Sequence, residues 1–222
     1  MKNLTLKNIA EVCGGTLYAP ETAALTEVTS ITTDSRTVES GSLFVAIKGE
    51  RVDGHKFIPN VMEAGALAVL SEMKLDMEIP YILVESSLNA VKAIAEFYLA
   101  QLGIPAIGIT GSVGKTSTKE MIASVLAQRF NTLKTLGNFN NELGLPLTIF
   151  RLRSEHEMAV LEMGISDFGE MTRLAKIAKP NTCVITNIGQ CHLENLIDRD
   201  GVLKAKTEIF EYLKMDGRAI LN

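Results

Sequence analysis

The sequence lacks the features that would cross-link it or place it in a membrane. Its three cysteines stand at spacings that form neither a C-x-x-C motif nor a paired framework, which predicts free thiols in a reducing compartment. No apolar run approaches the roughly 18 residues of a membrane-spanning helix, and the opening MKNLTLKNIAEVCGG has no signal-peptide core. We therefore expect a cytoplasmic chain without membrane insertion.

The chain also lacks an excess of positive charge. It carries 22 Lys and Arg against 26 Asp and Glu, and this net charge of −4 excludes a broad electrostatic surface for nucleic acid. Any site for a polyanion therefore has to be local. What is present is an ordinary globular composition, with 46% hydrophobic and 22% charged residues, over a length that allows one large domain or two modest ones.

The chain has no internal repeat, so domain boundaries have to be predicted from the order and spacing of its apolar runs. Up to Gly103 short strands and helices follow in mixed order, whereas from Ile104 strands alternate with helices, which predicts a parallel sheet covered on both faces. We expect an α/β protein with a small mixed N-terminal domain at 1–103 and a mostly parallel P-loop ATPase domain at 104–222.

The individual elements follow from periodicity and turn residues. In the first part we expect helices near 4–15, 55–66 and 87–102, and strands near 30–33, 42–47, 67–70 and 81–84. In the second part we expect strands near 106–110, 158–162 and 183–186, and helices near 115–130, 168–178 and 202–213. Residues 218–222 look like the start of a further strand, and a sheet that ended there would leave an unpaired edge. We therefore expect a piece of a longer protein with an incomplete second domain.

The sharpest motif is GSVGKTS at 111–117, between an apolar strand and a helix. Gly111 and Gly114 let successive N–H groups point at one anion, and the start of the helix adds its positive end. Lys115 supplies a cation for the β- and γ-phosphates, and the Thr116 hydroxyl is placed to bind Mg²⁺. The match is to the shorter G-x-x-G-K-T form, because Ile109 stands where the general pattern has glycine. The predicted ATP site comprises Gly111, Ser112, Val113, Gly114, Lys115, Thr116 and Ser117; the alternative is a glycine-rich turn without a ligand.

Two further residues lie at or after the carboxyl ends of predicted strands, where open parallel sheets place their ligands. Glu162 closes an apolar run, and a carboxylate there is costly to bury unless it is paired or metal-bound; the alternative is a surface glutamate. His192 lies in the loop after the strand at 183–186, with a structural histidine as the alternative. With Thr116 these residues are the candidate Mg²⁺ ligands. The amide-rich segment at 137–146 suits either a turn or substrate binding.

Read together, these segments resemble the Mur ligases. The loop at 110–116 looks like the ATP loop of that family, 186–194 resembles its histidine loop, and 206–210 resembles the site of its carbamylated lysine. Segments at 137–146 and 161–164 look like one branch of the family more than its sister ligases. Upstream, 33–36, 41–49 and 53–55 are similar to its UDP-sugar-binding domain. The resemblance covers essentially the whole chain.

The resemblance implies a monomeric enzyme that uses ATP to join D-alanyl-D-alanine to UDP-N-acetylmuramoyl-tripeptide in peptidoglycan synthesis, through an acyl phosphate. It implies that Lys115, His192 and Lys206 are catalytic, that Thr116, Glu162 and His192 hold Mg²⁺, and that Lys206 carries a carbamate. Only an uncharged amine captures CO₂, and burial or nearby cations favour that state. Without the resemblance, Lys206 would be assigned to a solvated helix face beside Lys204. The implied substrate-binding residues are Asp34, Ser35, Arg36, Lys48, Asp53, His55, Asn138 and Asn141.

Three alternatives stay open. A sister ligase would add a single amino acid instead of a dipeptide. A kinase or nucleotide-switch protein would use the phosphate loop but leave the segments at 33–36 and 53–55 unexplained. A module that binds UDP-sugar or nucleotide without catalysis is the third. Because a third domain closes over the site in the family, we expect these 222 residues alone to have little ligation activity.

Overall fold

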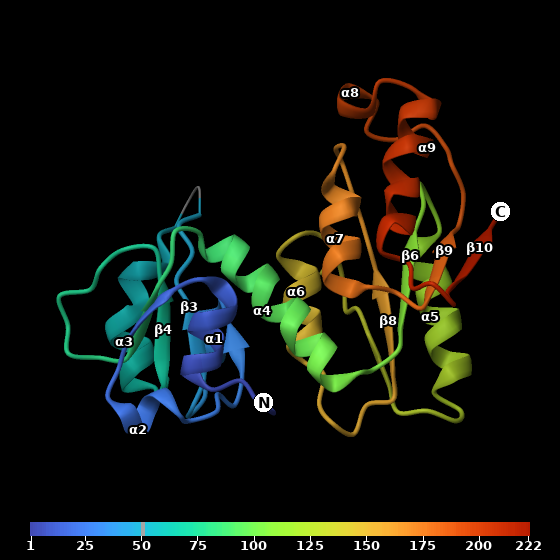
Figure 1. Ribbon diagram of the computed structural model, residues 1–222. Coiled ribbons are helices and arrows are strands. Elements are labelled where there is room, and N and C mark those ends of the chain that lie inside the picture. The colour runs from blue at the N-terminus through green and yellow to red at the C-terminus, as the bar shows by residue number, and fades with distance from the viewer. Residues whose placement is uncertain (50–51) are drawn as a thin grey trace. The chain divides into compact units, whose positions relative to one another are not determined.

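The computed structural model describes residues 1–49 and 52–222, which form two compact units, Met1–Gln101 and Leu102–Asn222. Each unit contains a five-stranded sheet with helices packed against it (Figure 1), which confirms the α/β class. In the described part of the chain, no helix has both the length and the apolar character needed to cross a bilayer.

The sheet of the first unit is mixed. Its strand order is β1-β5-β4-β3-β2, with β1 antiparallel to β5 and all other neighbours parallel. β3 and β4 are buried along their whole length, which explains why they appear in the sequence as continuous apolar runs. The strands are β1 Thr16–Tyr18, β2 Ile31–Thr32, β3 Leu43–Val45, β4 Ala68–Ser71 and β5 Tyr81–Leu83. The helices are α1 Leu6–Cys13, α2 Glu21–Ala24, α3 Ile58–Glu63 and α4 Ser87–Leu102, with 3-10 turns η1 Ser35–Thr37 and η2 Gly54–Phe57.

Most of the elements expected in this unit are present, but the extent predicted for one helix is wrong. The helix expected at 87–102 is confirmed as α4. The helix expected at 55–66 is divided: η2 precedes α3, which begins with Pro59 in its first turn and ends before Gly65 at φ +96°. The strand β1 and the helix α2 were not expected, because three and four residues are too short to show a period.

The sheet of the second unit is parallel throughout, in the order β10-β9-β6-β8-β7. Ile109, Val160 and Val184 pack on one face against α5, and Gly108 approaches Ile209 of η3 on the other, so both faces are covered as expected. The strands are β6 Ala106–Thr110, β7 Thr132–Lys134, β8 Met158–Glu162, β9 Thr182–Ile185 and β10 Arg218–Leu221. The helices are α5 Lys115–Leu126, α6 Gly144–Ile149, α7 Glu170–Ala178, α8 Leu193–Leu196 and α9 Arg199–Thr207, followed by the 3-10 turn η3 Glu208–Tyr212.

Two differences in the second unit matter for the site. The helix expected at 202–213 is divided into α9 and η3, so the residues after Thr207 turn more tightly than an α-helix. The segment at 137–146 is not a turn alone, because α6 begins at Gly144 and buries Leu145 and Ile149. Pro146 is compatible with this helix because it lies in the first turn, where a backbone N–H has no partner within the helix.

Candidate active site

The phosphate loop is the turn between β6 and α5. Gly111 has φ +148° and Gly114 has φ +80°, conformations that favour glycine. A Cβ at Gly111 would lie 1.9 Å from Thr186 Oγ1, so this position excludes any side chain. No side chain caps the start of α5, which leaves its first N–H groups directed at the loop. The turn is thus shaped to receive an anion.

The loop that follows β9 fixes the phosphate loop from the side. Asn187 Oδ1 accepts from Val113 N at 3.1 Å, and Thr186 Oγ1 donates to Val113 O at 2.6 Å. Ser112 Oγ accepts from Gly189 N at 2.9 Å, and Cys191 Sγ lies 3.2 Å from the same oxygen. These contacts were not expected from the sequence, because they join residues more than seventy positions apart.

Lys115 begins α5, which follows β6, and Glu162 ends the neighbouring strand β8. Lys115 Nζ donates to Gly111 O at 2.8 Å, so its ammonium stays within the loop. Glu162, at the end of β8, is 2% exposed, and its Oε2 accepts from Thr116 Oγ1 at 3.0 Å. β6 and β8 are parallel neighbours, so their carboxyl ends share one edge of the sheet. The structure therefore brings together Thr116 and Glu162, and Glu162 is no surface glutamate.

A hydroxyl and a carboxylate fit the oxygen ligands that Mg²⁺ prefers, with the remaining positions filled by water and phosphate. In residues 1–49 and 52–222, no three His, Cys, Asp or Glu side chains gather closely enough to hold a metal by themselves. A magnesium ion at this pair would therefore take its further ligands from water and from the phosphates of a bound nucleotide.

His192 stands apart from this pair. It is exposed, has φ +51° and precedes α8, and among the described residues it makes no hydrogen bond or ion pair with Thr116 or Glu162. Its role as a metal ligand and catalytic residue stays a prediction. Ser117 is exposed on the first turn of α5 and stays a predicted ATP contact.

Asn140, which was not among the residues predicted from the sequence, is the amide that contacts Glu162. Its Nδ2 donates to Glu162 Oε1 at 2.9 Å. Asn141 instead uses Oδ1 to accept from Gly144 N at 2.8 Å, at the start of α6, and Asn138 lies with it on a surface groove. This groove has a volume of about 280 Å³ and is lined by Asn138, Phe139, Asn141, Leu143, Gly144 and Leu147. The sequence offered three amides within four positions and no means of choosing among them.

Lys206 is buried in α9, with 1% of its surface exposed. Burial lowers the pKa of its amine below the ordinary value, Cys191 opposes this effect, and the positive charge of Lys115 adds to it. Lys204, two positions earlier, is exposed, with its ammonium 5.7 Å from the centre of the Phe168 ring. The description of a solvated helix lysine therefore applies to Lys204 and is wrong for Lys206.

The candidate substrate residues of the first unit form two separate local pairs. In η1, Arg36 Nε donates to Asp34 Oδ1 at 2.8 Å and Arg36 Nη2 to Asp34 Oδ2 at 2.6 Å, and this pairing lowers the pKa of Asp34 to about 2. Ser35 lies between them. At η2, His55 Nδ1 lies 2.7 Å from Asp53 Oδ1, and Asp53 forms a β-bridge with Lys48.

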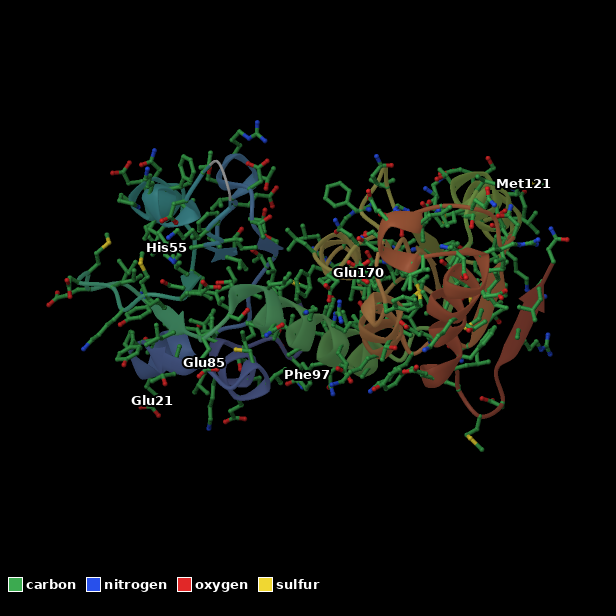
Figure 2. All side chains as sticks on the ribbon, turned by 90° about the horizontal axis from the view of Figure 1, so that it is seen from above. Glu21, His55, Glu85, Phe97, Met121 and Glu170 are labelled. Atoms are coloured by element: carbon green, nitrogen blue, oxygen red, sulfur yellow. The ribbon has the colours of Figure 1, made fainter. Side chains whose placement is uncertain are left out.

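The buried imidazole of His55 uses only one of its two nitrogens in a hydrogen bond within the described residues. Its side chain is 7% exposed, and Nε2 has no hydrogen-bond partner within the described part of the chain. His55 belongs to the 3-10 turn η2 of the first unit and is labelled in Figure 2. The Asp53–His55 contact holds the ring in one orientation. The role of these residues in substrate binding stays a prediction.

Comparison with known proteins places this geometry in a family. The protein-family model described as "Mur ligase family, catalytic domain" matches residues 27–108. The family model described as "Mur ligase middle domain" matches residues 109–222. A ligase of Bacillus subtilis named UDP-N-acetylmuramoyl-tripeptide–D-alanyl-D-alanine ligase is 46% identical over 220 residues, covering 96% of this chain and 47% of that protein.

Solved structures give the same result. The crystal structure of MurF from Acinetobacter baumannii matches with a TM-score of 0.90 at 38% identity, over 98% of this chain and 48% of that one. MurF from Thermotoga maritima, solved in complex with ADP, matches with a TM-score of 0.80 at 37% identity, over 86% of this chain and 45% of that one. The chain thus spans about half the length of the relatives it matches.

Proposed function

The chain belongs to the Mur ligase family, and from this premise we propose that it serves the ATP-dependent addition of D-alanyl-D-alanine to UDP-N-acetylmuramoyl-tripeptide in peptidoglycan synthesis. The observation that carries the proposal is the contact between Thr116 and Glu162. A Gly-Lys-Thr loop with a buried carboxylate on the neighbouring strand end is the arrangement that a nucleotide with its metal ion requires.

In the proposed reaction the γ-phosphoryl group of ATP passes to the peptide carboxylate, giving an acyl phosphate and ADP. The amine of the dipeptide then attacks the acyl carbon, and an amide forms as phosphate leaves. The N–H groups at the start of α5 and the ammonium of Lys115 hold the β- and γ-phosphates and offset the charge on the transferring group.

Thr116 and Glu162 would hold Mg²⁺ in this site, with His192 as the further ligand that the family resemblance implies. A bound magnesium ion neutralises phosphate charge and orients the transferring group. Asn140 fixes the second oxygen of Glu162, so the carboxylate keeps one orientation. Asn138 and Asn141 would contact substrate from the groove in front of α6.

Lys206 is proposed to carry a carbamate, because its buried amine has a lowered pKa and is therefore more often uncharged. With ¹³C-labelled bicarbonate near pH 8, the ¹³C NMR spectrum should contain one carbamate signal that disappears in Lys206→Met. The matched control is Lys204→Met on the same helix, which should keep the signal since Lys204 is exposed. A signal that survives in Lys206→Met would assign the carbamate elsewhere.

The UDP-sugar would be held in the first unit by Asp34, Ser35, Arg36, Lys48, Asp53 and His55. Two features support this assignment. The Arg36 side chain is 85% exposed, and Asp34 holds it through Nε and Nη2, so that its remaining N–H groups can meet an anion. His55 presents a buried Nε2 that lacks a partner within the described residues and can bond a ligand.

Separate titrations of UDP-N-acetylmuramoyl-tripeptide and Mg·ADP into the 222-residue chain test the proposal. Both ligands are expected to bind, each without displacing the other, since the candidate residues for the UDP-sugar moiety lie in the first unit and those for the phosphates of ADP lie in the second. Binding of ADP without any affinity for the UDP-sugar would favour a kinase or nucleotide switch, and the reverse would favour a non-catalytic UDP-sugar module. If the chain belongs to a sister ligase that adds a single amino acid, a UDP-N-acetylmuramoyl substrate with a shorter peptide should bind better than the tripeptide form.

A further inference from the structure

Three charged side chains are fully buried in the described part of the chain: Lys119, Glu162 and Lys206. All three lie in the second unit. The proposed function uses Glu162 and Lys206 but gives no role to Lys119. Taking an ammonium out of water costs much free energy unless an anion compensates it, so a fully buried lysine calls for an explanation.

Lys119 lies on the side of α5 that faces the sheet. It shares the apolar stripe of Ile122, Ala123 and Leu126, which packs against β6, β8 and β9. Two positions later, Met121 is 69% exposed on the outer side of the helix (Figure 2). Lysine at an apolar stripe position was a signal available in the sequence, and it points to a buried charge with a partner.

The partners of Lys119 are two carboxylates of unequal burial. Its Nζ lies 3.2 Å from Glu120 Oε1 and 3.7 Å from Glu162 Oε2. The side chain of Glu120 is 47% exposed and also pairs with Lys134, so water and a second cation already compensate it. Glu162 is different: its remaining side-chain contacts, from Thr116 and Asn140, are neutral. Among the described residues, Lys119 is thus the cation that balances Glu162.

This balance affects which ions the site can bind. With Glu162 and Lys119 side by side, the local charge sums to zero, and a divalent ion at Glu162 Oε2 would experience repulsion from the ammonium in a buried setting. The phosphates of a nucleotide bring several negative charges and further oxygen ligands, which reverse this balance. A divalent ion therefore gains far more from Thr116 and Glu162 when it arrives with phosphate.

We propose that Lys119 is the internal counter-ion of Glu162, and that it makes tight binding of a divalent cation at Thr116 and Glu162 conditional on nucleotide phosphate. The inference rests on the proposed function, because it takes Glu162 as the metal ligand. Lys119 is a positioning residue, since it acts through Glu162 and needs no contact with substrate.

Mn²⁺ is the probe, and electron paramagnetic resonance measures the free ion in the presence of the chain. Without nucleotide, Lys119→Met is expected to bind Mn²⁺ about tenfold more tightly than the parent chain, because the repelling charge is gone. Lys119→Arg keeps the charge and should stay within about twofold of the parent. Glu157→Gln, which alters an exposed carboxylate outside this cluster, should also leave the Mn²⁺ affinity unchanged. A gain in ion affinity is a result that general structural damage does not produce.

An unchanged or weaker Mn²⁺ affinity in folded Lys119→Met would overturn the inference. If Lys119→Met does not fold, folding of the Lys119→Met/Glu162→Gln double variant tests the counter-ion role instead, since this variant buries no unpaired charge. Folding of the double variant supports the counter-ion role, and its failure to fold overturns it. The proposed function fails in a different way: the parent chain would then bind Mn²⁺ no better with ADP than without it.

Discussion

Replacing Lys115 by alanine is expected to weaken ADP binding by about 10- to 100-fold. A hydrogen bond to a charged group contributes about 1.5–3 kcal/mol, and about 1.4 kcal/mol corresponds to tenfold in affinity. The Lys115 ammonium already lies in the loop, 2.8 Å from Gly111 O, so little reorganisation is needed for it to reach a phosphate. Isothermal titration calorimetry with ADP at fixed Mg²⁺ measures the change.

Lys176→Ala is the matched control for this experiment. Lys176 is an exposed lysine in the last turn of α7, in the same unit, so its removal changes the net charge equally without altering the loop. ADP affinity should stay within about twofold of the parent, because a single exposed charge is largely screened at physiological salt. Equal losses in the two variants would mean that Lys115 acts through overall charge and not through the phosphate loop.

The second large effect is expected at Glu162. Glu162→Gln keeps the size of the side chain and can still accept from Thr116, but it removes the charge that a magnesium ion requires. Mg²⁺ should strengthen ADP binding to the parent chain, and this increase should fall by about tenfold or more in the variant, or about 1.4 kcal/mol. ADP affinity in the absence of Mg²⁺ should not fall below that of the parent, because the loop amides and Lys115 are unchanged.

Glu157→Gln supplies the control, since Glu157 immediately precedes β8 and Glu162 ends it. Glu157 is exposed and accepts from Asn131 N through Oε2, a contact that glutamine can keep. Its magnesium dependence should match that of the parent. If Glu162→Gln instead retains the full effect of Mg²⁺ on ADP affinity, Glu162 is not the metal ligand, and the buried carboxylate is a structural partner of Lys119 and Thr116.

The elements predicted best from the sequence are those with a continuous apolar run or a clear amphipathic stripe. β6 and β8 have the bounds expected from their apolar runs, and α4 has those expected from its amphipathic stripe. β7 was not expected, because its three residues become a strand only by pairing with β8. α6 was not expected because Gly144 and Pro146 are typical of turns, whereas the burial of Leu145 and Ile149 stabilises a helix there.

The site could be predicted to the extent that its chemistry is local. The phosphate loop is contiguous, so Gly111, Gly114, Lys115 and Thr116 were found from spacing alone. Its pairing with Glu162 followed from the rule that parallel strands end at one edge. The burial of Lys119 was signalled by its place on an apolar stripe, but its pairing with Glu162, like that of Asn140, depends on how α5 and the segment before α6 pack against β8. No short motif encodes that packing.

The proposed function depends above all on the turn at 111–116 binding nucleotide phosphate beside Glu162. The amide ¹H–¹⁵N spectrum of the labelled chain, recorded during titration with Mg·ADP, tests this most directly. If the turn binds phosphate, saturable shifts are expected that are largest at Gly111, Gly114, Lys115, Thr116 and Glu162, with little change in Met1–Gln101. Saturable binding whose largest shifts lie outside this turn, or no shifts at millimolar ADP, would contradict it.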